Sequence, residues 1–253
     1  MNKEVKLFMV YDILSDTIRT GPQLWKIDRK RLADIKNHSL DLLLIYRILR
    51  DKFPIKLDND KMYDYLMFHD LPEAITGDIT KFDGISSEES DRVKSLAINY
   101  LNDRFGNIIN FDKVINGFEN QVDLEAKIAY MIDKIYSGIE FIKYEAEKPI
   151  NVKNPSVNSS LINYPYVKKS IEEGKSVSEM FYIYHCKSVK ITDEELEKYG
   201  ISRNIADQIV SIILSFIDEF YDEKENKTLF DEKKNFPKEA TIYNRNEENT
   251  NNC

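Results

Sequence analysis

The segment HDLPEAITGD, residues 69–78, holds the side chains best suited to chemistry in this chain. It places His69 directly before Asp70, and two further carboxylates, Glu73 and Asp78, follow within the next eight residues. An imidazole beside a carboxylate suits a divalent ion with mixed nitrogen and oxygen preference, such as Mn, Co, Fe or Zn. Two interpretations are therefore open: a solvated acidic turn after a buried helix, or a metal site that performs hydrolysis.

The dipeptide His69-Asp70 can supply two ligands only at a particular place in a helix. Neighbouring residues of a regular helix point about 100° apart, so both side chains reach one point only where the helix ends or distorts. Pro72 and the turn after it supply such an end. Because two ligands are too few, a second histidine and another acid must come from elsewhere in the sequence.

His38 and Asp133 are the candidates for the missing ligands. His38 stands just before the apolar run LDLLLIYRIL, and Asp133 interrupts the apolar segment AKIAYMIDKIYSGI. An acid in such a segment is costly to bury unless it is paired or bound to a metal. Small residues one turn away, Ala129 and Ser137, leave room beside it. The predicted set leaves positions open for water and substrate and consists of His38, His69, Asp70 and Asp133.

Each of these residues also has an ordinary structural interpretation. The histidine–aspartate pair could mark a plain helix end, and His38 could be a surface residue at a helix start. Asp133 could pair with Lys127 or Lys134. These interpretations must all hold together, and they leave the rest of HDLPEAITGD unexplained.

The elements that position these residues are predicted to be helices. Apolar residues recur at three- and four-residue spacing, and the chain has only 8 Gly and 7 Pro. A short turn is expected from Pro72 to Gly77, a loop over 150–165, and two or three helices beyond it. The fold class is therefore all-α, and the clearest candidate helices are 3–18, 32–53, 60–69, 86–105, 122–147 and 204–223.

The composition restricts the class of protein and its partners. A chain of 253 residues with 42% hydrophobic and 32% charged residues is typical of a soluble globular protein. The formal net charge of −8 argues against a nucleic acid polymer as partner, since a phosphate backbone requires clustered Lys and Arg. A small anionic substrate stays open, because a bound metal and one or two basic residues can reverse the local sign.

The sequence shows no sign of export or membrane insertion. No apolar run approaches the roughly 20 residues that span a bilayer, and charged residues interrupt the apolar N-terminal segment. The two cysteines, Cys186 and Cys253, do not form a disulfide framework. We therefore expect a cytoplasmic protein that does not act at a membrane.

Four motifs together resemble a known family. RTGP, NHSLDLLL, HDLPEAITGDI and AYMIDKI stand in the order found in HD-domain phosphohydrolases, and the 5′-deoxynucleotidase-like branch is the most similar. The resemblance covers residues 3–148. Two positions depart from the branch: Asn37 replaces an acid, and Pro22 stands near the place of a Trp that shapes the sugar pocket, with Trp25 further on.

The resemblance implies a role for each matched residue. The four residues of the predicted set would be the metal ligands, and the fold would be an HD-domain helical bundle with additional C-terminal helices. Glu73 would lie near the attacking water or the attacked phosphate, and Asp78 would act as a second acid or base. Arg19 would contact the phosphate through its fork-shaped guanidinium, and Trp25 would border the substrate.

The number of histidines favours a single metal ion. Dinuclear members of the family use additional histidines between the HD pair and the final aspartate, and residues 71–132 contain none. His185 is expected to be a packed or surface residue. The expected cofactor is therefore one divalent transition metal ion, Co, Mn, Fe or Zn, with Mg as an alternative.

The resulting hypothesis is a metal-dependent phosphohydrolase of nucleotides. The expected reaction converts a deoxynucleoside 5′-monophosphate to nucleoside and phosphate. The alternatives are a nucleoside triphosphate attacked at its α-phosphate, and a catalytically weak nucleotide sensor. A homo-oligomer is compatible with the sequence. The expected organisation is one phosphohydrolase unit over 1–223, with core 3–148 and helical extension 149–223, followed by a polar, poorly ordered tail over 224–253.

Overall fold

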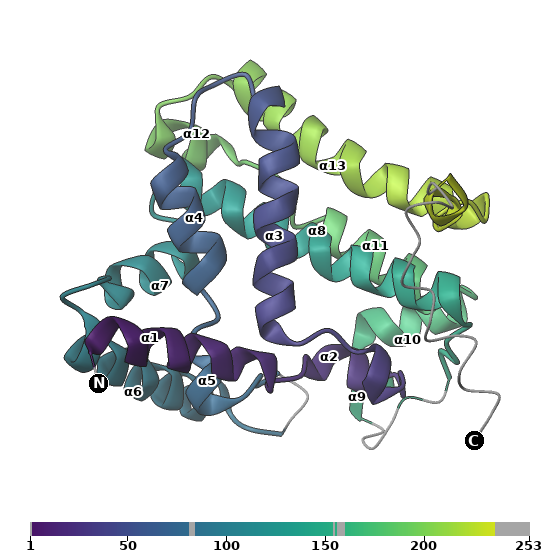
Figure 1. The fold of residues 1–253 in the computed structure, drawn as a ribbon. Coiled ribbons are helices and arrows are strands. Elements are labelled where there is room, and N and C mark those ends of the chain that lie inside the picture. The colour runs from purple at the N-terminus through teal and green to yellow at the C-terminus, as the bar shows by residue number, and fades with distance from the viewer. Residues whose placement is uncertain (1, 81–83, 154, 156–159, 236–253) are drawn as a thin grey trace.

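The computed structural model describes residues 2–80, 84–153, 155 and 160–235. Within these ranges the protein is built from helices and turns, and its one β-type pairing is an isolated antiparallel bridge between Ile18 and Asp34. Figure 1 shows the helices arranged around a long central helix. The all-α prediction is confirmed.

The N-terminal part contains eight α-helices in the described ranges. They are α1 Lys3–Asp12, α2 Thr20–Gln23, α3 Ile35–Leu49, α4 Asn59–Phe68, α5 Glu73–Thr76, α6 Ser87–Phe105, α7 Phe111–Glu119 and α8 Leu124–Glu147. The C-terminal part adds α9 Ser160–Asn163, α10 Pro165–Glu172, α11 Val177–Cys186, α12 Asp193–Tyr199 and α13 Arg203–Glu225. Short 3-10 turns cover Ile13–Ser15, Arg29–Arg31, Arg50–Lys52 and Asp231–Asn235.

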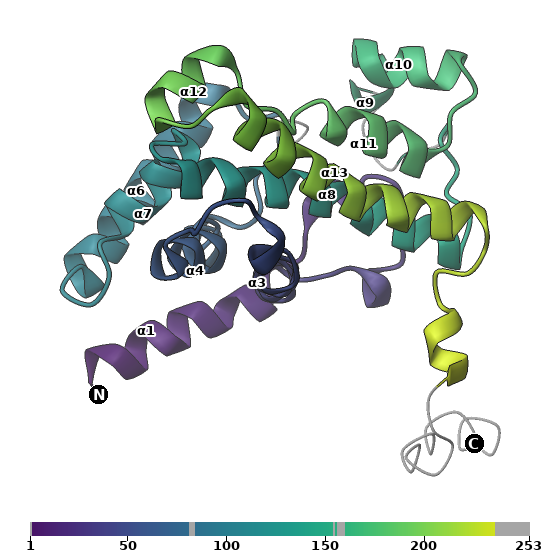
Figure 2. The ribbon, with the colours of Figure 1, turned by 90° about the horizontal axis from the view of Figure 1, so that it is seen from above.

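The central helix α8 is covered on opposite sides. Figures 1 and 2 show α1 and α3 on one side of it and α10 and α11 on the other. Sixteen of its 24 residues are buried, so it has no broad solvated face and acts as a core helix. Because α3, α4 and α7 of the N-terminal part and α11 and α13 of the extension all pack against it, α8 joins both parts.

Helix starts follow the capping side chains. Asp34 accepts a hydrogen bond from the Asn37 N–H, so α3 begins at Ile35 and not at the predicted residue 32. Asp123 caps α8 in the same way through the Ala126 N–H. Gly77 ends α5 with φ +73°, a left-handed conformation that glycine adopts without steric cost.

Three apolar clusters hold the helices together. The main cluster surrounds α8 with side chains from α3, α4, α7 and α13, and a second one joins α1, α6 and α7. We call the remaining one the third apolar cluster. It joins the C-terminal half of α8 to α10 and α11, and consists of Trp25, Ile27, Phe141, Tyr144, Leu161, Val167, Val177 and Met180.

The structure also shows elements that the sequence did not predict. The nine-residue helix α7 begins at Phe111, and the side chain of the preceding Asn110 accepts a hydrogen bond from the Lys113 N–H. Its buried apolar residues recur at a spacing of three and four, so a helical signal was present in the sequence and was overlooked. The short helix α9 lies in a segment predicted as loop. Helix α13 runs to Glu225 and the turn Asp231–Asn235 follows, so described structure continues into the predicted tail, of which residues 236–253 lie outside the described ranges. The division into a core, an extension and a tail stays a prediction.

No helix in the described part of the chain is by itself long and apolar enough to cross a membrane. The bent pair α12 and α13, with 106° between them, meets the length and composition limits only when the two helices are joined.

Candidate metal centre

The histidine–aspartate pair lies where α4 ends. His69 is the C-cap residue of α4, and the chain turns at once, with the Glu73 N–H donating to the Asp70 carbonyl at 3.0 Å. This turn brings His69 Nε2 within 3.1 Å of Asp70 Oδ2. The helix end expected from the sequence is therefore present, and it allows two adjacent side chains to face one point.

His38 and Asp133 complete the group from two other helices. His38 stands in the first turn of α3, and its Nε2 lies 3.2 Å from Asp133 Oδ1 and 3.5 Å from Asp70 Oδ2. His69 Nε2 lies 4.0 Å from the same Asp133 oxygen. Candidate ligand atoms of His38, His69 and Asp133 all lie within 4.8 Å of one another. The structure thus brings the four predicted ligands together from α3, α8 and the end of α4.

The burial of this group fits a divalent ion. His38 is 0% exposed and His69 is 3% exposed, yet the ring nitrogens of both find no hydrogen-bond partner of good geometry among the described residues. Buried polar atoms in native proteins are nearly always satisfied, so such a set calls for a missing partner. Two imidazoles and two carboxylates supply the donor types of a transition-metal site. These residues therefore fit the ion that the sequence predicts.

Lys134 fixes the charge of Asp133 from the opposite side. Its Nζ lies 2.8 Å from Asp133 Oδ2 and 4.6 Å from the centre of the Tyr130 ring, while Asp133 Oδ1 faces the histidines. Burial alone would raise the pKa of Asp133, but Lys134, His38 and His69 hold that pKa well below its ordinary value. The pairing with Lys134 considered from the sequence is present, and it coexists with the metal group. Lys127 pairs instead with Glu195 at 2.7 Å.

The two histidines have opposite pKa shifts. Burial and the nearby Arg19 cation lower the pKa of His38 to about 4, so its ring is neutral at physiological pH. Burial also opposes a charge on His69, but the contact with Asp70 outweighs it and raises the pKa of that ring. Because metals bind neutral imidazole, His38 is already in the ligating form, whereas the contact with Asp70 favours the protonated form of the His69 ring.

Glu73 lies beside the centre in a half-buried position among other charged groups. It is the first residue of α5, and its Oε2 is buried without a hydrogen-bond partner in the described part of the chain. Burial and the neighbouring carboxylates Asp70 and Asp78 raise its pKa well above the ordinary value. Glu73 also lines a hollow of about 100 Å³ together with His69, Thr76 and other residues. It is therefore a carboxyl group that can hold a proton next to the candidate metal ligands.

Asp78 ties the loop of Arg19 to this region. The Thr20 N–H donates to Asp78 Oδ2 at 2.5 Å, and the Thr20 hydroxyl donates to the Asp78 carbonyl at 2.8 Å. These bonds hold the residue that follows Arg19 against the end of the HDLPEAITGD segment. The predicted acid–base role of Asp78 stays a prediction, and the structure adds a structural use of its carboxylate.

Arg19 lies along α8 on the face that carries Asp133. Its Nε is 3.0 Å from Glu140 Oε2, and its Nη2 donates to Ser137 Oγ at 3.4 Å. Its guanidinium carbon stands 5.9 Å from the centre of the Tyr136 ring. The predicted phosphate contact therefore stands beside the predicted metal ligands.

Sequence reasoning missed Glu140 and the ring of Tyr136. Tyr136 packs its ring 4.9 Å from that of His38 and donates from its hydroxyl to Asp41 Oδ2 at 2.7 Å. A signal for Glu140 was present in the sequence. Polar residues at 133, 137, 140 and 144 share one face of α8, because their spacing is four, three and four, and we call this face the polar stripe of α8.

The structure does not bring Trp25 to the four ligands. Its side chain is 3% exposed, belongs to the third apolar cluster, and meets Phe181 of α11 edge-on at 6.2 Å. This places it between the N-terminal loop and the extension as a packing residue. His185, predicted to be packed or on the surface, stacks on the same Phe181 at 5.8 Å.

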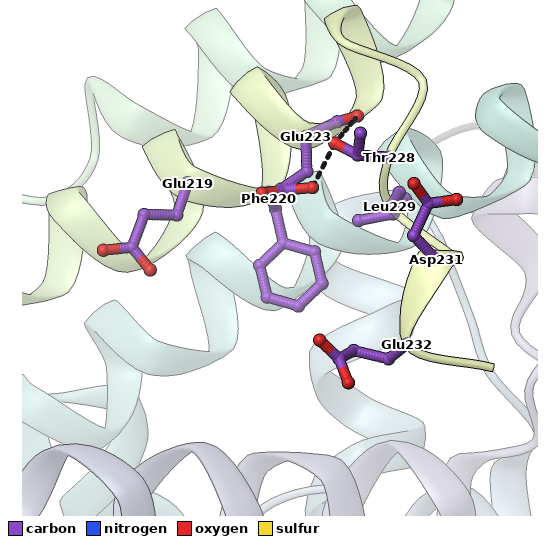
Figure 3. Close-up of a pocket in the computed structure, with 7 residues that line it drawn as sticks. All are labelled: Glu219, Phe220, Glu223, Thr228, Leu229, Asp231 and Glu232. Carbon is purple, nitrogen blue, oxygen red and sulfur yellow. Dashed lines mark hydrogen bonds between the residues drawn. The ribbon is translucent and has the colours of Figure 1, made fainter. Parts of the chain in front are cut away.

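A second hollow lies at the far end of α13. Figure 3 shows its lining side chains, with Thr228 hydrogen-bonded to Glu223. None of the predicted site residues lines it, and no histidine does. It is a different place from the centre described above, and its lining residues are Glu219, Phe220, Glu223, Thr228, Leu229, Asp231 and Glu232.

Comparisons with known proteins agree with this geometry. Two curated relatives are named 5′-deoxynucleotidases: one from Saccharomyces cerevisiae, 29% identical over 47% of this chain and 51% of the relative, and one from Xenopus laevis, 24% identical over 44% of this chain and 55% of the relative. The chain therefore spans about half the length of the curated relatives it matches.

Solved structures show a similar fold. A protein of Pyrococcus horikoshii superposes with a TM-score of 0.53 at 15% identity, over 83% of this chain and 98% of that one. A structure from Magnetospirillum magnetotacticum, described as a predicted metal-dependent phosphohydrolase, gives 0.52 at 12% identity, over 90% of this chain and 93% of that one. At these identities the likeness concerns the fold.

A family model described as HD domain matches residues 12–173, which include α3, α4, α8 and all four candidate ligands. This match covers more than half of the chain. The chain belongs to the HD-domain family.

Proposed function

We propose that this protein is a metal-dependent phosphohydrolase that converts a deoxynucleoside 5′-monophosphate to nucleoside and phosphate. The observation that carries the proposal is the group of two imidazoles and two carboxylates from separate elements. His38, His69 and Asp133 are buried, Asp70 is half-buried, and the ring nitrogens lack a well-aligned hydrogen-bond partner among the described residues. The names of the two curated relatives support the choice of a 5′-deoxynucleotidase reaction.

The residues of the centre divide the work of phosphoester hydrolysis. A divalent ion, when bound, would lower the pKa of a coordinated water and polarise a phosphoryl oxygen. His38, His69, Asp70 and Asp133 would hold it. Glu73, with a raised pKa and a buried carboxyl oxygen, can exchange a proton with the attacking water or the leaving alkoxide. Asp78 is the second candidate for this exchange.

Arg19 supplies the positive charge for the phosphate. Its Nε lies 3.0 Å from Glu140 Oε2, and one N–H of Nη2 donates to Ser137. The other N–H groups of Nη1 and Nη2 are the part of the planar fork that can match two oxygens of a phosphoryl group. Burial alone would lower the pKa of Arg19, but Glu140, Asp133 and Asp78 raise it, so the guanidinium stays charged.

The charge balance favours a substrate with a single phosphate. Among the described residues, Arg19, Lys94 and Lys134 are the main cations that act on Glu73 and the two histidines. Each is paired with a carboxylate: Glu140, Glu119 and Asp133, respectively. A triphosphate brings several further negative charges, which would need cations beyond these pairs. The triphosphate alternative is therefore less well supported by this site.

A substrate panel tests the proposal. The purified chain, loaded with Mn or Co, is incubated with deoxynucleoside and ribonucleoside monophosphates and with deoxynucleoside triphosphates, and the released phosphate species are identified by chromatography. We expect inorganic phosphate from the deoxynucleoside monophosphates. Release of triphosphate would replace the proposal with hydrolysis at the α-phosphate, and nucleotide binding without turnover would replace it with a sensor.

A further inference from the structure

We propose that Glu140 is a positioning residue, which holds the Arg19 guanidinium so that it points along α8 toward Asp133. This inference rests on the proposed function, in which Arg19 binds the phosphate. Glu140 lies two helical turns beyond Asp133, and no motif of the sequence includes it. Its role would be to orient the Arg19 guanidinium toward the substrate without contacting the substrate itself.

The direction of the guanidinium follows from its two contacts on α8. Nε of Arg19 is 3.0 Å from Glu140, and Nη2 is 3.4 Å from Ser137, which lies one turn closer to Asp133. Ser137 Oγ in turn lies 3.5 Å from the Asp133 carbonyl oxygen. The guanidinium therefore extends from Glu140 toward the metal centre, parallel to the polar stripe of the helix.

Glu140 is itself fixed and has few other partners. It is 3% exposed, and the Tyr144 hydroxyl donates to its Oε1 at 3.3 Å, which leaves Oε2 for Arg19. The same Tyr144 oxygen accepts from the Ala33 N–H at 3.0 Å. A buried carboxylate is costly unless it is paired and hydrogen-bonded, so this arrangement commits Glu140 to Arg19.

The backbone of the Arg19 loop is held by other contacts. The Arg19 N–H donates to the Ala33 carbonyl at 3.2 Å, and the Ile35 N–H donates to the Thr17 carbonyl at 2.9 Å. On the next residue, the Thr20 N–H is bound by Asp78. Because both flanks of Arg19 are pinned without Glu140, the loop is expected to stay in place when Glu140 changes. What Glu140 adds is the orientation of one side chain.

The matched control is Glu147, on the last turn of the same helix. It pairs with Arg31 at 2.7 Å and is 47% exposed in its side chain, so it is also an Arg–Glu pair of this region. Arg31 and Glu147 belong to neither the metal group nor the substrate contacts. Glu147→Gln therefore repeats the chemical change of Glu140→Gln at a place that does not orient the side chain proposed to bind phosphate.

The experiment measures kcat and KM for a deoxynucleoside monophosphate in the native chain and in four variants. These are Glu140→Gln, Glu147→Gln, Arg19→Ala and the double variant that combines Arg19→Ala with Glu140→Gln. We expect Glu140→Gln to lower kcat/KM by about 10- to 100-fold, the range caused by a small misplacement of a positioning group. Metal content should stay near native, and Glu147→Gln should match the native chain. The melting temperature of Glu140→Gln should fall, because the buried Arg19 cation loses its partner, so the kinetics are measured at a temperature at which every variant is folded. The double variant should equal Arg19→Ala, because Glu140 acts only through Arg19.

Two results would overturn the inference. One is an additive loss in the double variant, which would show that Glu140 acts independently of Arg19. The other is a loss in Glu140→Gln that follows only from less metal or less folded protein. If Glu140→Gln does not fold, Glu140→Asp keeps the charge and is expected to retain part of the native kcat/KM.

Binding of inorganic phosphate, measured by calorimetry on the Mn-loaded chain, separates this inference from the proposed function. A native chain without turnover, but with phosphate binding weakened equally by Arg19→Ala and Glu140→Gln, would contradict the nucleotidase proposal and support the positioning role. If the native chain turns over substrate, and Glu140→Gln keeps native phosphate binding and a native kcat/KM, the result would support the nucleotidase proposal and contradict the positioning role. Neither turnover nor phosphate binding in the native chain would overturn both.

Discussion

The metal centre and the third apolar cluster occupy two parts of the same helix and are buried for different reasons. Asp133, in the first half of α8, faces two histidines whose ring nitrogens are unsatisfied in the described structure. Phe141, in the second half, stacks on Phe181 with 3.9 Å between ring centres. Burial of an apolar side chain is favourable without any specific partner, because it removes apolar surface from water. Burial of a polar group is unfavourable unless the group has a hydrogen-bond or charge partner. The unsatisfied polar groups therefore indicate that a ligand binds at the metal centre and not at the third apolar cluster.

The loop of residues 19–25 shows the same contrast at short range. Arg19 turns to the polar stripe of α8, and Trp25, six residues later, turns to the third apolar cluster. Two residues of one short loop therefore lie in different surroundings, and the substrate contact of Trp25 stays a prediction.

Replacement of a metal ligand should produce the largest difference between the two regions. Asp70→Ala is expected to abolish metal binding and phosphate release, because Asp70 Oδ2 is the oxygen that lies within 3.5 Å of both imidazoles. Helical content should persist, since Asp70 follows the end of α4. Elemental analysis, a phosphate assay and circular dichroism measure the three quantities.

The control for this variant is Asp60→Ala, an exposed acid in the first turn of the same helix. It should keep native metal content and activity. Near-native turnover of Asp70→Ala would show that the four residues are not the metal site.

The sequence predicted which side chains the fold brings together at the candidate metal centre, because their pattern is local and unusual, while their role as metal ligands stays a prediction. The helix end at His69 and the acid within an apolar helix at Asp133 are both visible without a structure. The capped start of α3 was misplaced by three residues, since Asp34 and not the apolar pattern determines it. The predicted helix ends near residues 105 and 147 agree with the structure.

What could not be predicted depends on contacts between distant segments. The pairing of Arg19 with Glu140 joins residues 121 positions apart, so no spacing rule links them. Trp25 is buried in a cluster that α11, some 150 residues later, helps to form, and Phe181 of that helix meets its ring edge-on. In both cases the extension and the central helix decide the environment of a residue whose own neighbourhood in the sequence is uninformative.

Replacement of Glu73 should have the next largest effect, within the metal centre alone. Glu73→Gln keeps the shape of the side chain but removes the group that exchanges a proton, so the rate should fall on the order of 100-fold or more. Metal content should stay native, because Glu73 is not one of the four ligands. Steady-state kinetics and elemental analysis check the two statements.

Glu197→Gln, an exposed residue of α12, is the matched control and should leave the rate unchanged. A native rate in Glu73→Gln would remove Glu73 from the chemistry and leave Asp78 as the acid–base candidate. Loss of metal in Glu73→Gln would instead make Glu73 a ligand.

Replacement of Trp25 should have the smallest effect on activity and should be confined to the third apolar cluster. Trp25→Phe removes part of a ring that is 3% exposed, so the free energy of unfolding should fall by about 1–3 kcal/mol. The exposed Phe8 offers a control, since Phe8→Leu should change that free energy by no more than about 0.5 kcal/mol. Urea unfolding of the metal-free chains measures both values.

The KM for the deoxynucleoside monophosphate then separates packing from substrate binding at Trp25. If the ring serves only to join the loop to α11, KM and metal content stay native while stability falls, because the edge-on contact with Phe181 is lost or weakened. A raised KM with unchanged stability would return Trp25 to the substrate pocket, as the resemblance implies. The two regions would then share a residue, and the extension would take part in substrate selection through α11.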